Sequence, residues 1–266
     1  MGNAATAAAD RSALLEVETT GAVLSIGLNR PAKRNALNDG IILALQDCFS
    51  HIPDGIGAVV IHGIGDHFSS GLDLSELTEH DATEGLRHSQ MWHRVFDRIQ
   101  YCRVPVIAAL KGAVIGGGLE LACAAHIRVA EPSAYFALPE GQRGIFVGGG
   151  GSVRLPRLIG VARMTDMMLT GRVYSATEGA SYGFSQYLTE EGNAFAKAME
   201  LAARVATNAP LTNFAVLQAL PMISEANPPT GLVMESLMAT VAQSDKEAKT
   251  RIRAFLDRKT AKVKPS

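Results

Sequence analysis

The chain has 266 residues, of which 47% are hydrophobic and 19% charged, and its formal net charge is -1 at pH 7. This balance excludes a protein that binds nucleic acid or another polyanion through bulk charge, and it excludes a charge-driven disordered chain. A chain of this length can bury about 70% or more of its unfolded surface, so it needs neither disulfides nor a metal to fold.

The cysteines and the hydropathy of the chain indicate the cellular compartment of the protein. The three cysteines, Cys48, Cys102 and Cys123, match no metal-ligand spacing and no disulfide framework, so we expect buried, reduced thiols. No apolar run reaches the ~18 residues that a membrane span needs. No signal peptide is visible at the N-terminus. We therefore expect a cytoplasmic protein with no membrane partner and a flexible tail at residues 1–12.

The first half of the chain alternates between short runs rich in Val, Leu and Ile and segments with apolar residues at helical spacing. Two runs that meet at Thr20 and Gly21 predict a β-hairpin. The later runs are apolar and separated by helices, which favours a mainly parallel sheet covered by helices. The predicted strands lie at residues 13–19, 22–28, 57–62, 104–110, 127–130 and 135–138.

Three helices are expected among these strands. Asn38 or Asp39 can cap the first, the second covers residues 83–101, and the glycines at 116–118 open the third, which runs through Ala125. The apolar spacing in the second helix predicts one buried face made of Leu86, Val95, Phe96 and Ile99.

From about Ser152 the pattern becomes almost wholly helical, with a break at residues 227–229 (NPP). We expect an α/β core domain at residues 13–191 and a C-terminal helical region at residues 192–266. No low-complexity linker separates the two parts, so a mobile hinge between them is not expected. The candidate helices of the C-terminal region lie at residues 192–208, 211–224, 231–244 and 246–259.

Several motifs of catalysis and cofactor binding are absent. The sequence has no GxxxxGK[ST], no GxGxxG after a strand, no GxSxG and no HExxH. Its seven histidines are scattered without metal-ligand spacing. We therefore expect no metal and no bound cofactor, which leaves catalysis to carboxylates and backbone dipoles.

Two glycine-containing loops follow buried strands. At residues 112–120 (GAVIGGGLE), glycines open a helix whose first N–H groups have no internal partner and carry the positive end of the helix dipole. Such a terminus can stabilise a developing oxyanion, and residues 68–74 (FSSGLDL) could supply the second donor. A tight strand-to-helix packing turn explains the first loop equally well.

Two glutamates accompany these loops. Glu120 lies in the first turn of the glycine-opened helix, where the dipole favours a glutamate whether or not it is catalytic, and keeps it ionised. Glu140 follows Pro139 and a short apolar strand, so desolvation is expected to raise its pKa. Two carboxylates on separate elements could hold one water between them, which suits addition of water to a polarised double bond or proton transfer beside a carbonyl.

Together these segments resemble the crotonase superfamily, the enoyl-CoA hydratase/isomerase family, from about Leu15 to Lys259. The resemblance implies the crotonase spiral of ββα units, followed by a helical tail that builds homotrimers, often paired into hexamers. The matching segments are 29–38 (NRPAKRNALN), 68–74 (FSSGLDL), 112–120 (GAVIGGGLE), 139–140 (PE), and 149–151 (GGG) with 154–156 (RLP).

The resemblance also implies roles for individual residues. The N–H groups of Leu72 and Gly117 would form an oxyanion hole for a thioester carbonyl, and Glu120 and Glu140 would be the acid and base. Trp92 and Phe146 are candidates for the acyl pocket. Coenzyme A enters as part of an acyl-CoA substrate, and the residues expected to bind the substrate or its CoA are Lys33, Arg34, Ala36, Leu37, Ser70, Gly71, Asp73 and Gly116.

Having both glutamates favours reversible hydration of a trans-2-enoyl-CoA over isomerisation within this family. The departures, Leu72 in place of the usual alanine and Val147 in place of a proline, affect the acyl pocket more than the reaction. An enoyl-CoA isomerase stays an alternative. A hydroxycinnamoyl-CoA hydratase/lyase is disfavoured because no tyrosine follows Tyr187. A catalytically dead scaffold or an RNA-binding subunit using Lys249 to Lys264 is the non-enzymatic alternative.

Overall fold

The structure is a computed structural model that describes residues 13–76 and 81–257. The chain divides into two compact units, residues 1–206 and 207–266. The tail expected at residues 1–12 lies outside the described residues. The expected domain boundary falls before α8 (Ala194–Ala206), whereas the two compact units divide after this helix.

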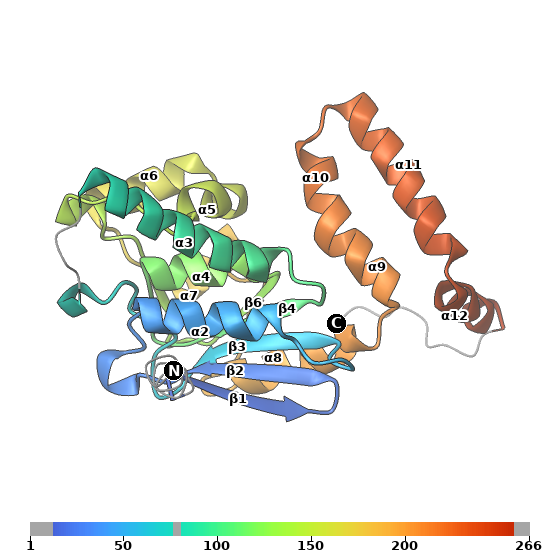
Figure 1. Ribbon diagram of the computed structural model, residues 1–266, viewed down its shortest axis with the longest axis horizontal. Coiled ribbons are helices and arrows are strands. Elements are labelled where there is room, and N and C mark those ends of the chain that lie inside the picture. The colour runs from blue at the N-terminus through green and yellow to red at the C-terminus, as the bar shows by residue number, and fades with distance from the viewer. Residues whose placement is uncertain (1–12, 77–80, 258–266) are drawn as a thin grey trace, which may run out of the picture. The chain divides into compact units, whose positions relative to one another are not determined.

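A six-stranded sheet organises the first unit (Figure 1). The hairpin of β1 and β2 is antiparallel, as predicted, and every later neighbour pairs in parallel. A second sheet has the order β5-β7-β8. The strands of the first sheet, in spatial order, are β1 (Leu15–Thr20), β2 (Val23–Leu28), β3 (Ala58–Gly63), β4 (Val106–Leu110), β6 (Ile127–Ala130) and β9 (Tyr187–Leu188).

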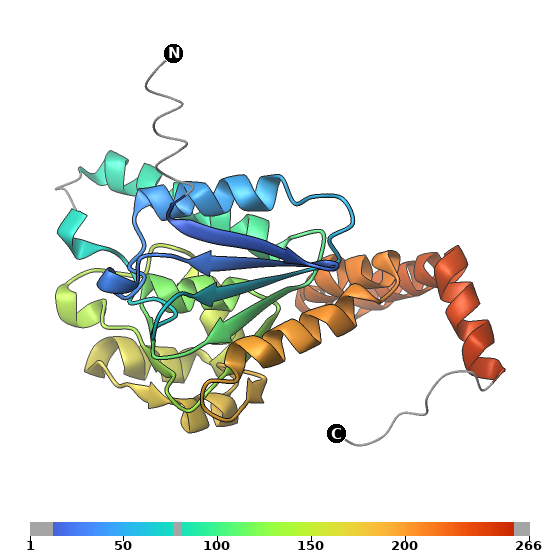
Figure 2. The same ribbon diagram turned by 90° about the horizontal axis from the view of Figure 1, so that it is seen from below.

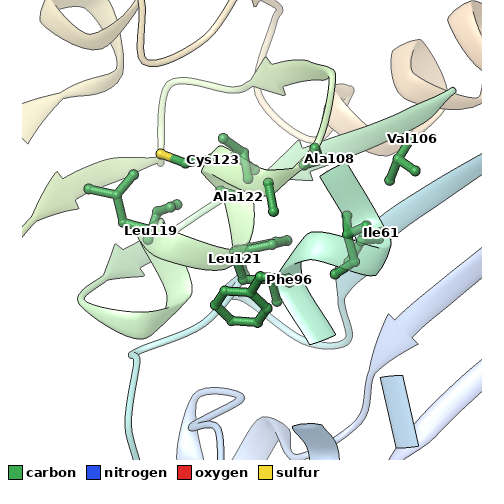
Figure 3. Close-up of a cluster of buried hydrophobic side chains, with 14 of the residues drawn as sticks. Ile61, Phe96, Val106, Ala108, Leu119, Leu121, Ala122 and Cys123 are labelled. Carbon is green, nitrogen blue, oxygen red and sulfur yellow. The ribbon is translucent and has the colours of Figure 1, made fainter. Parts of the chain in front are cut away.

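Helices cover both faces of the six-stranded sheet. On one face, apolar residues of α2 (Asp39–Ser50), α3 (Ala82–Gln100) and α4 (Gly117–Ala124) bury the main core (Figure 1). Figure 3 shows part of it, where Phe96 and Leu121 lie with Ile61 of the sheet. On the other face, α8 packs against alternate residues of the same strands, among them Val60 and Ile107 (Figure 2). The expected helix-covered sheet is confirmed.

The helix starts follow local capping chemistry. Asn38 caps α2, and its side chain accepts a hydrogen bond from the N–H of Ile41 at 3.1 Å. The expected inner face of α3 is wrong at one position, because Leu86 is 60% exposed while Trp92 is buried. At about 3.6 residues per turn, Leu86 lies two and a half turns before Val95 and therefore on the opposite side of the helix.

The stretch after Ser152 contains α5 (Gly151–Ile159), α6 (Val161–Thr170) and α7 (Ala176–Tyr182). It also contains two short strands that the helical pattern did not predict. β8 (Tyr174–Ser175) pairs with β7 (Tyr135–Ala137), which itself pairs with β5 (Ala113–Ile115). β9 extends the large sheet beside β6. A two-residue strand is too short to show any periodicity, so only the pairing reveals it.

The second unit is helical throughout its described residues. Its first helical segment comprises α9 (Pro210–Phe214), a π-helical turn (Ala215–Ala219) and α10 (Leu220–Glu225). Asn227 caps α11 (Pro228–Ser244), so the predicted break is confirmed, and α12 (Lys246–Leu256) follows. Large apolar side chains are exposed on this unit, among them Met222, Leu232 and Leu237. No described helix combines the length and hydropathy of a membrane span.

Candidate active site

Two strand-following loops, one face of α3 and the loop between β7 and α5 enclose a pocket of about 570 Å³ in the first unit. Nine of the residues expected from the sequence line this pocket: Ser70, Leu72, Asp73, Trp92, Gly116, Gly117, Glu120, Glu140 and Phe146. Five others do not line it: Lys33, Arg34, Ala36, Leu37 and Gly71.

The two loops expected to carry oxyanion donors lie against each other. Ser69 forms a parallel bridge with Val114, and Gly71 follows in the left-handed region at φ +86°. A Cβ on Gly71 would lie 2.6 Å from the carbonyl oxygen of Ile115, so only glycine allows this approach. The backbone N of Leu72 consequently lies 3.5 Å from the position that a Cβ on Gly117 would occupy.

The N–H groups of Leu72 and Gly117 are available to a ligand. Neither donates to a protein acceptor among the described residues. Gly117 begins α4, where the first N–H groups have no partner inside the helix. Both residues line the same pocket. The arrangement can therefore place two convergent donors on one oxygen atom, although the bulkier side chain at Leu72 narrows the space beside it.

Glu140 is a buried carboxylate beside these donors. It is 7% exposed, and its Oε2 has no hydrogen-bond partner among the described residues. Gly116 lies directly against it at φ +53°, where a Cβ would stand 2.7 Å from Oε1. Burial is the main cause that raises the pKa of Glu140 to about 7. The sequence-based expectation of a raised pKa is confirmed, and the value suits a group that both gives and takes a proton near neutral pH.

Glu120 is held by a different part of the chain. Its Oε1 accepts hydrogen bonds from the N–H groups of Gly149 and Gly151, both at 2.8 Å. Burial raises the pKa of Glu120, and these two hydrogen bonds oppose that rise. The sequence-based expectation relied on the positive end of α4 to keep this carboxylate ionised. That reasoning was incomplete, because burial has the larger effect and the glycine turn supplies the donors.

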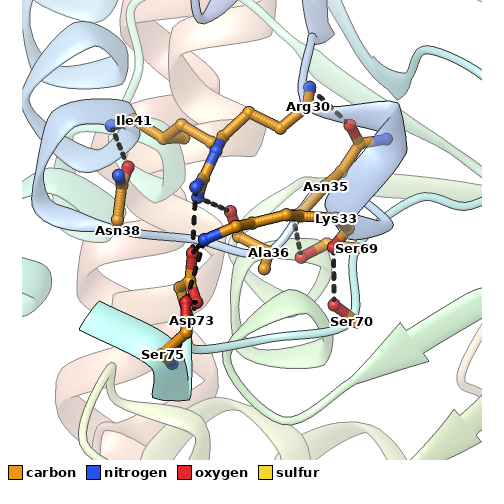
Figure 4. Close-up of polar contacts among 10 residues, drawn as sticks. All are labelled: Arg30, Lys33, Asn35, Ala36, Asn38, Ile41, Ser69, Ser70, Asp73 and Ser75. Carbon is orange, nitrogen blue, oxygen red and sulfur yellow. Dashed lines mark hydrogen bonds and ion pairs between the residues drawn. The ribbon is translucent and has the colours of Figure 1, made fainter. Parts of the chain in front are cut away.

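Polar contacts join the segment expected to bind CoA to the first of the two loops expected to carry oxyanion donors (Figure 4). The buried Asp73 carboxylate pairs with Arg30 at 2.9 Å and Lys33 at 3.0 Å. Burial by itself would raise the pKa of Asp73, but hydrogen bonds from Ser75, Lys33 and Arg30 hold it well below its ordinary value. Lys33 thus has an internal partner, and Ala36 and Leu37 are buried, so any contact they make to a ligand would be through the backbone.

Asn35 is a structural residue that the sequence reasoning missed. It is buried in the left-handed region at φ +53°. Its side chain accepts from the N–H of Arg30 and donates to the carbonyls of Ile64 and His67. Asparagine tolerates this conformation better than most residues, which is the one signal the sequence carried.

The two expected acyl-pocket residues differ in environment. Trp92 is 4% exposed, and its ring packs against Gly117 and edge-on to Phe96 at a centroid distance of 5.7 Å. Phe146 is 68% exposed and lies beside the half-exposed Ile145 at the pocket. Polar side chains of the lining that were not assigned to the site from the sequence include Asp39, Ser89 and Arg143.

Within the described ranges, no group of three or more His, Cys, Asp and Glu side chains is arranged to hold a metal ion. The cysteines Cys102 and Cys123 are buried and Cys48 is half-buried, and all three are free thiols. The lining of the pocket includes the buried carboxylates of Glu120 and Glu140 together with Leu72 and Gly117, whose backbone N–H groups are available to a ligand.

Comparison with known proteins agrees with this arrangement. A crystal structure of a protein from Rhodopseudomonas palustris CGA009 is 82% identical and covers 96% of this chain and 98% of its own, with a TM-score of 0.92. The 2,3-dehydroadipyl-CoA hydratase of Escherichia coli is 33% identical over 91% of this chain and 95% of its own length. The short-chain-enoyl-CoA hydratase of Clostridium acetobutylicum is 30% identical over 91% and 94%.

The family model described as enoyl-CoA hydratase/isomerase matches residues 18–265, nearly the whole chain. The match spans both compact units, the two loops expected to carry oxyanion donors and the two glutamates. The protein therefore belongs to the enoyl-CoA hydratase/isomerase family, the crotonase superfamily.

Proposed function

We propose that this enzyme catalyses the reversible hydration of a trans-2-enoyl-CoA to a 3-hydroxyacyl-CoA. The observation that carries the proposal is the presence of Glu120 and Glu140 in one pocket with the free N–H groups of Leu72 and Gly117. Proton transfer without water addition needs only one base, so a second buried carboxylate favours hydration. The names of the two relatives compared above support the same reaction class.

In the proposed mechanism the thioester oxygen accepts hydrogen bonds from Leu72 and Gly117. Glu120 takes a proton from water as the water oxygen bonds to C3 of the substrate. The electron pair of the double bond moves toward the carbonyl, and the resulting enolate is held by the two N–H groups. Glu140 then delivers a proton to C2, which completes the addition of one water molecule.

A panel of thioesters tests the proposal. Loss of absorbance of the conjugated double bond should be followed for enoyl-CoA substrates from C4 to C16, for cinnamoyl-CoA and for 2,3-dehydroadipyl-CoA. We expect hydration of at least one of them, and the preferred acyl group defines the substrate. Conversion of 3-enoyl-CoA to 2-enoyl-CoA without hydration of any member would contradict the proposal and support an isomerase. Cleavage of a hydroxycinnamoyl thioester would support the lyase.

The loop at residues 33–37 is proposed to dock the CoA moiety, mainly through its backbone, with Lys33 or Arg34 near a phosphate. Because charge-assisted contacts contribute about 1.5–3 kcal/mol each, the double variant Lys33→Ala/Arg34→Ala should raise KM for an acyl-CoA about tenfold or more. Its kcat should change less. The matched control is Lys197→Ala/Arg204→Ala, which removes two cations of α8 outside the pocket.

A truncated substrate separates this role from a structural one. An acyl-pantetheine lacks the nucleotide phosphates, so its KM should not respond to Lys33→Ala/Arg34→Ala. Asp73 keeps Arg30 as a partner in this variant, so the oxyanion loop should stay in place. An unchanged KM for the CoA thioester would show that the loop is not the CoA site.

Self-association into a trimer or hexamer stays a prediction. It is supported by large apolar side chains that are exposed on the second unit, among them Leu232 and Leu237. Leu201 and Leu217, two other large apolar residues of the C-terminal helical region, are buried within the chain. Only some of the large apolar side chains of this region are thus available to a second copy.

A further inference from the structure

The glycine turn at residues 148–151, which binds Glu120, is itself held by side chains of α3 and α5. The carbonyl of Gly148 accepts a hydrogen bond from the Ser89 hydroxyl at 2.7 Å, and the carbonyl of Gly149 accepts one from Arg154 Nη1 at 2.9 Å. The N–H groups of Gly149 and Gly151 point the other way, onto Glu120. The turn therefore links these side chains of α3 and α5 to the carboxylate inside the pocket.

Arg154 is placed to fix this turn. Its guanidinium is buried, and it reaches α3 as well as the turn. Nε donates to Gln100 Oε1 at 2.6 Å, and Nη2 pairs with Asp97 Oδ1 at 2.5 Å. The planar fork thus directs three hydrogen bonds in fixed directions, which the single ammonium group of a lysine cannot reproduce.

We propose that Arg154 is a positioning residue for the reaction: by fixing the Gly149 carbonyl, it orients the N–H groups of Gly149 and Gly151 that set the position of Glu120. Arg154 does not line the pocket, so it acts through the turn and does not contact the substrate. The kinetic part of this inference rests on the proposed function. The part that concerns the turn rests on the contacts alone.

Arg154 also contributes charge. The titratable and charged groups that act on Glu120 are Arg154 from α5, His93 from α3, Glu140 from the loop after β7, and Cys123 on α4 itself. Burial raises the pKa of Glu120, whereas the turn hydrogen bonds and then the charges of Arg154 and His93 lower it. Loss of Arg154 removes one of the charges that lower the pKa of Glu120. The pKa of Glu120 should therefore rise further.

The kinetic test compares Arg154→Met and Arg154→Lys with Arg157→Met, which removes an exposed arginine of the same helix. Since a small misplacement of a reacting group can lower the rate about 10²-fold, Arg154→Met should lower kcat for hydration by roughly 10–100-fold with little change in KM. The acidic limb of its pH profile should move to higher pH. Arg154→Lys keeps the charge, so it should keep the limb while losing part of kcat.

A double variant shows whether Arg154 acts through Glu120. In the Glu120→Gln background, Arg154→Met should have almost no further effect on kcat. An equal loss in both backgrounds would overturn the proposal, as would a normal kcat in Arg154→Met. If Arg154→Met fails to fold, Asp97→Asn serves in its place, because Asp97 is half-exposed and anchors the same guanidinium. It should show a smaller kcat loss that also vanishes in the Glu120→Gln background.

Hydrogen exchange reports how firmly the glycine turn is held, and this measurement does not depend on which reaction the enzyme catalyses. The amides of residues 149 and 151 should exchange faster in Arg154→Met and at the native rate in Arg157→Met. Unchanged exchange in Arg154→Met would overturn the inference. A wild type that hydrates no thioester would contradict the proposed function and leave this measurement decisive for the turn.

Discussion

Replacement of Glu140 by glutamine is expected to lower kcat for hydration by about 10²–10⁴-fold or more. The change keeps the shape of the side chain but removes the group that exchanges a proton with C2. Gly116 and the buried surroundings of Glu140 stay the same, so KM should change little. The measurement is steady-state hydration of the best thioester. Glu131→Gln is the matched control, because Glu131 is a buried glutamate outside the pocket.

Because the pKa of Glu140 is about 7, the activity of the wild type should depend on pH near neutrality. As the acid in hydration, Glu140 must be protonated, so kcat/KM for hydration should fall as pH rises through about 7. Hydration takes up no net proton, so its equilibrium constant does not depend on pH, and kcat/KM for dehydration of the 3-hydroxyacyl-CoA should fall over the same pH range. Glu140→Gln should remove this limb in both directions. A variant with near-native activity and an unchanged profile would contradict the assignment.

Stability provides the folding control for the same variant. The folded-state pKa of Glu140 lies above its ordinary value of 4.5, so the unfolded chain loses this proton first as pH rises. Ionisation therefore lowers stability progressively between about pH 4.5 and 7, and the loss is complete above pH 7. Glu140→Gln cannot ionise, so its Tm at pH 8 should exceed that of the wild type. A lower Tm would mean that the kinetic loss includes misfolding.

Local signals in the sequence predicted most of the fold. The hairpin around Gly21, the cap at Asn38 and the break at Asn227 each depend on residues that are close in sequence. Leu86 was misplaced although its spacing argued against the assignment, because nine residues before Val95 is two and a half helical turns and so the opposite face. β8 and β9 are defined by pairing with distant strands, which no local pattern contains.

The sequence also predicted most of the residues of the site. The resemblance placed both glutamates and both donor loops in one pocket, and the structure brings them together. The partners of those groups were not predictable. Lys33 meets Asp73, and Glu120 meets Gly149, only because the chain returns over long sequence distances. Burial raises the pKa of Glu120 and the hydrogen bonds from Gly149 and Gly151 lower it, and neither effect could be read from its own helix terminus.

Replacement of Glu120 by glutamine should lower hydration by about 10²-fold or more, because water attack at C3 needs a base on the water. The amide can still accept the hydrogen bonds of Gly149 and Gly151 through its oxygen, so the turn should stay in place. Exchange of the C2 proton should persist in part, because Glu140 carries it.

The two activities are measured on the same preparations. Hydration of crotonyl-CoA is followed by absorbance, and deuterium exchange at C2 of a saturated acyl-CoA by mass spectrometry, for wild type, Glu120→Gln and Glu140→Gln. Glu120→Gln should lose hydration and keep exchange, whereas Glu140→Gln should lose both. If Glu120→Gln hydrates as fast as wild type, Glu120 serves only to anchor the glycine turn at the start of α5, and the group that activates water lies elsewhere in the pocket.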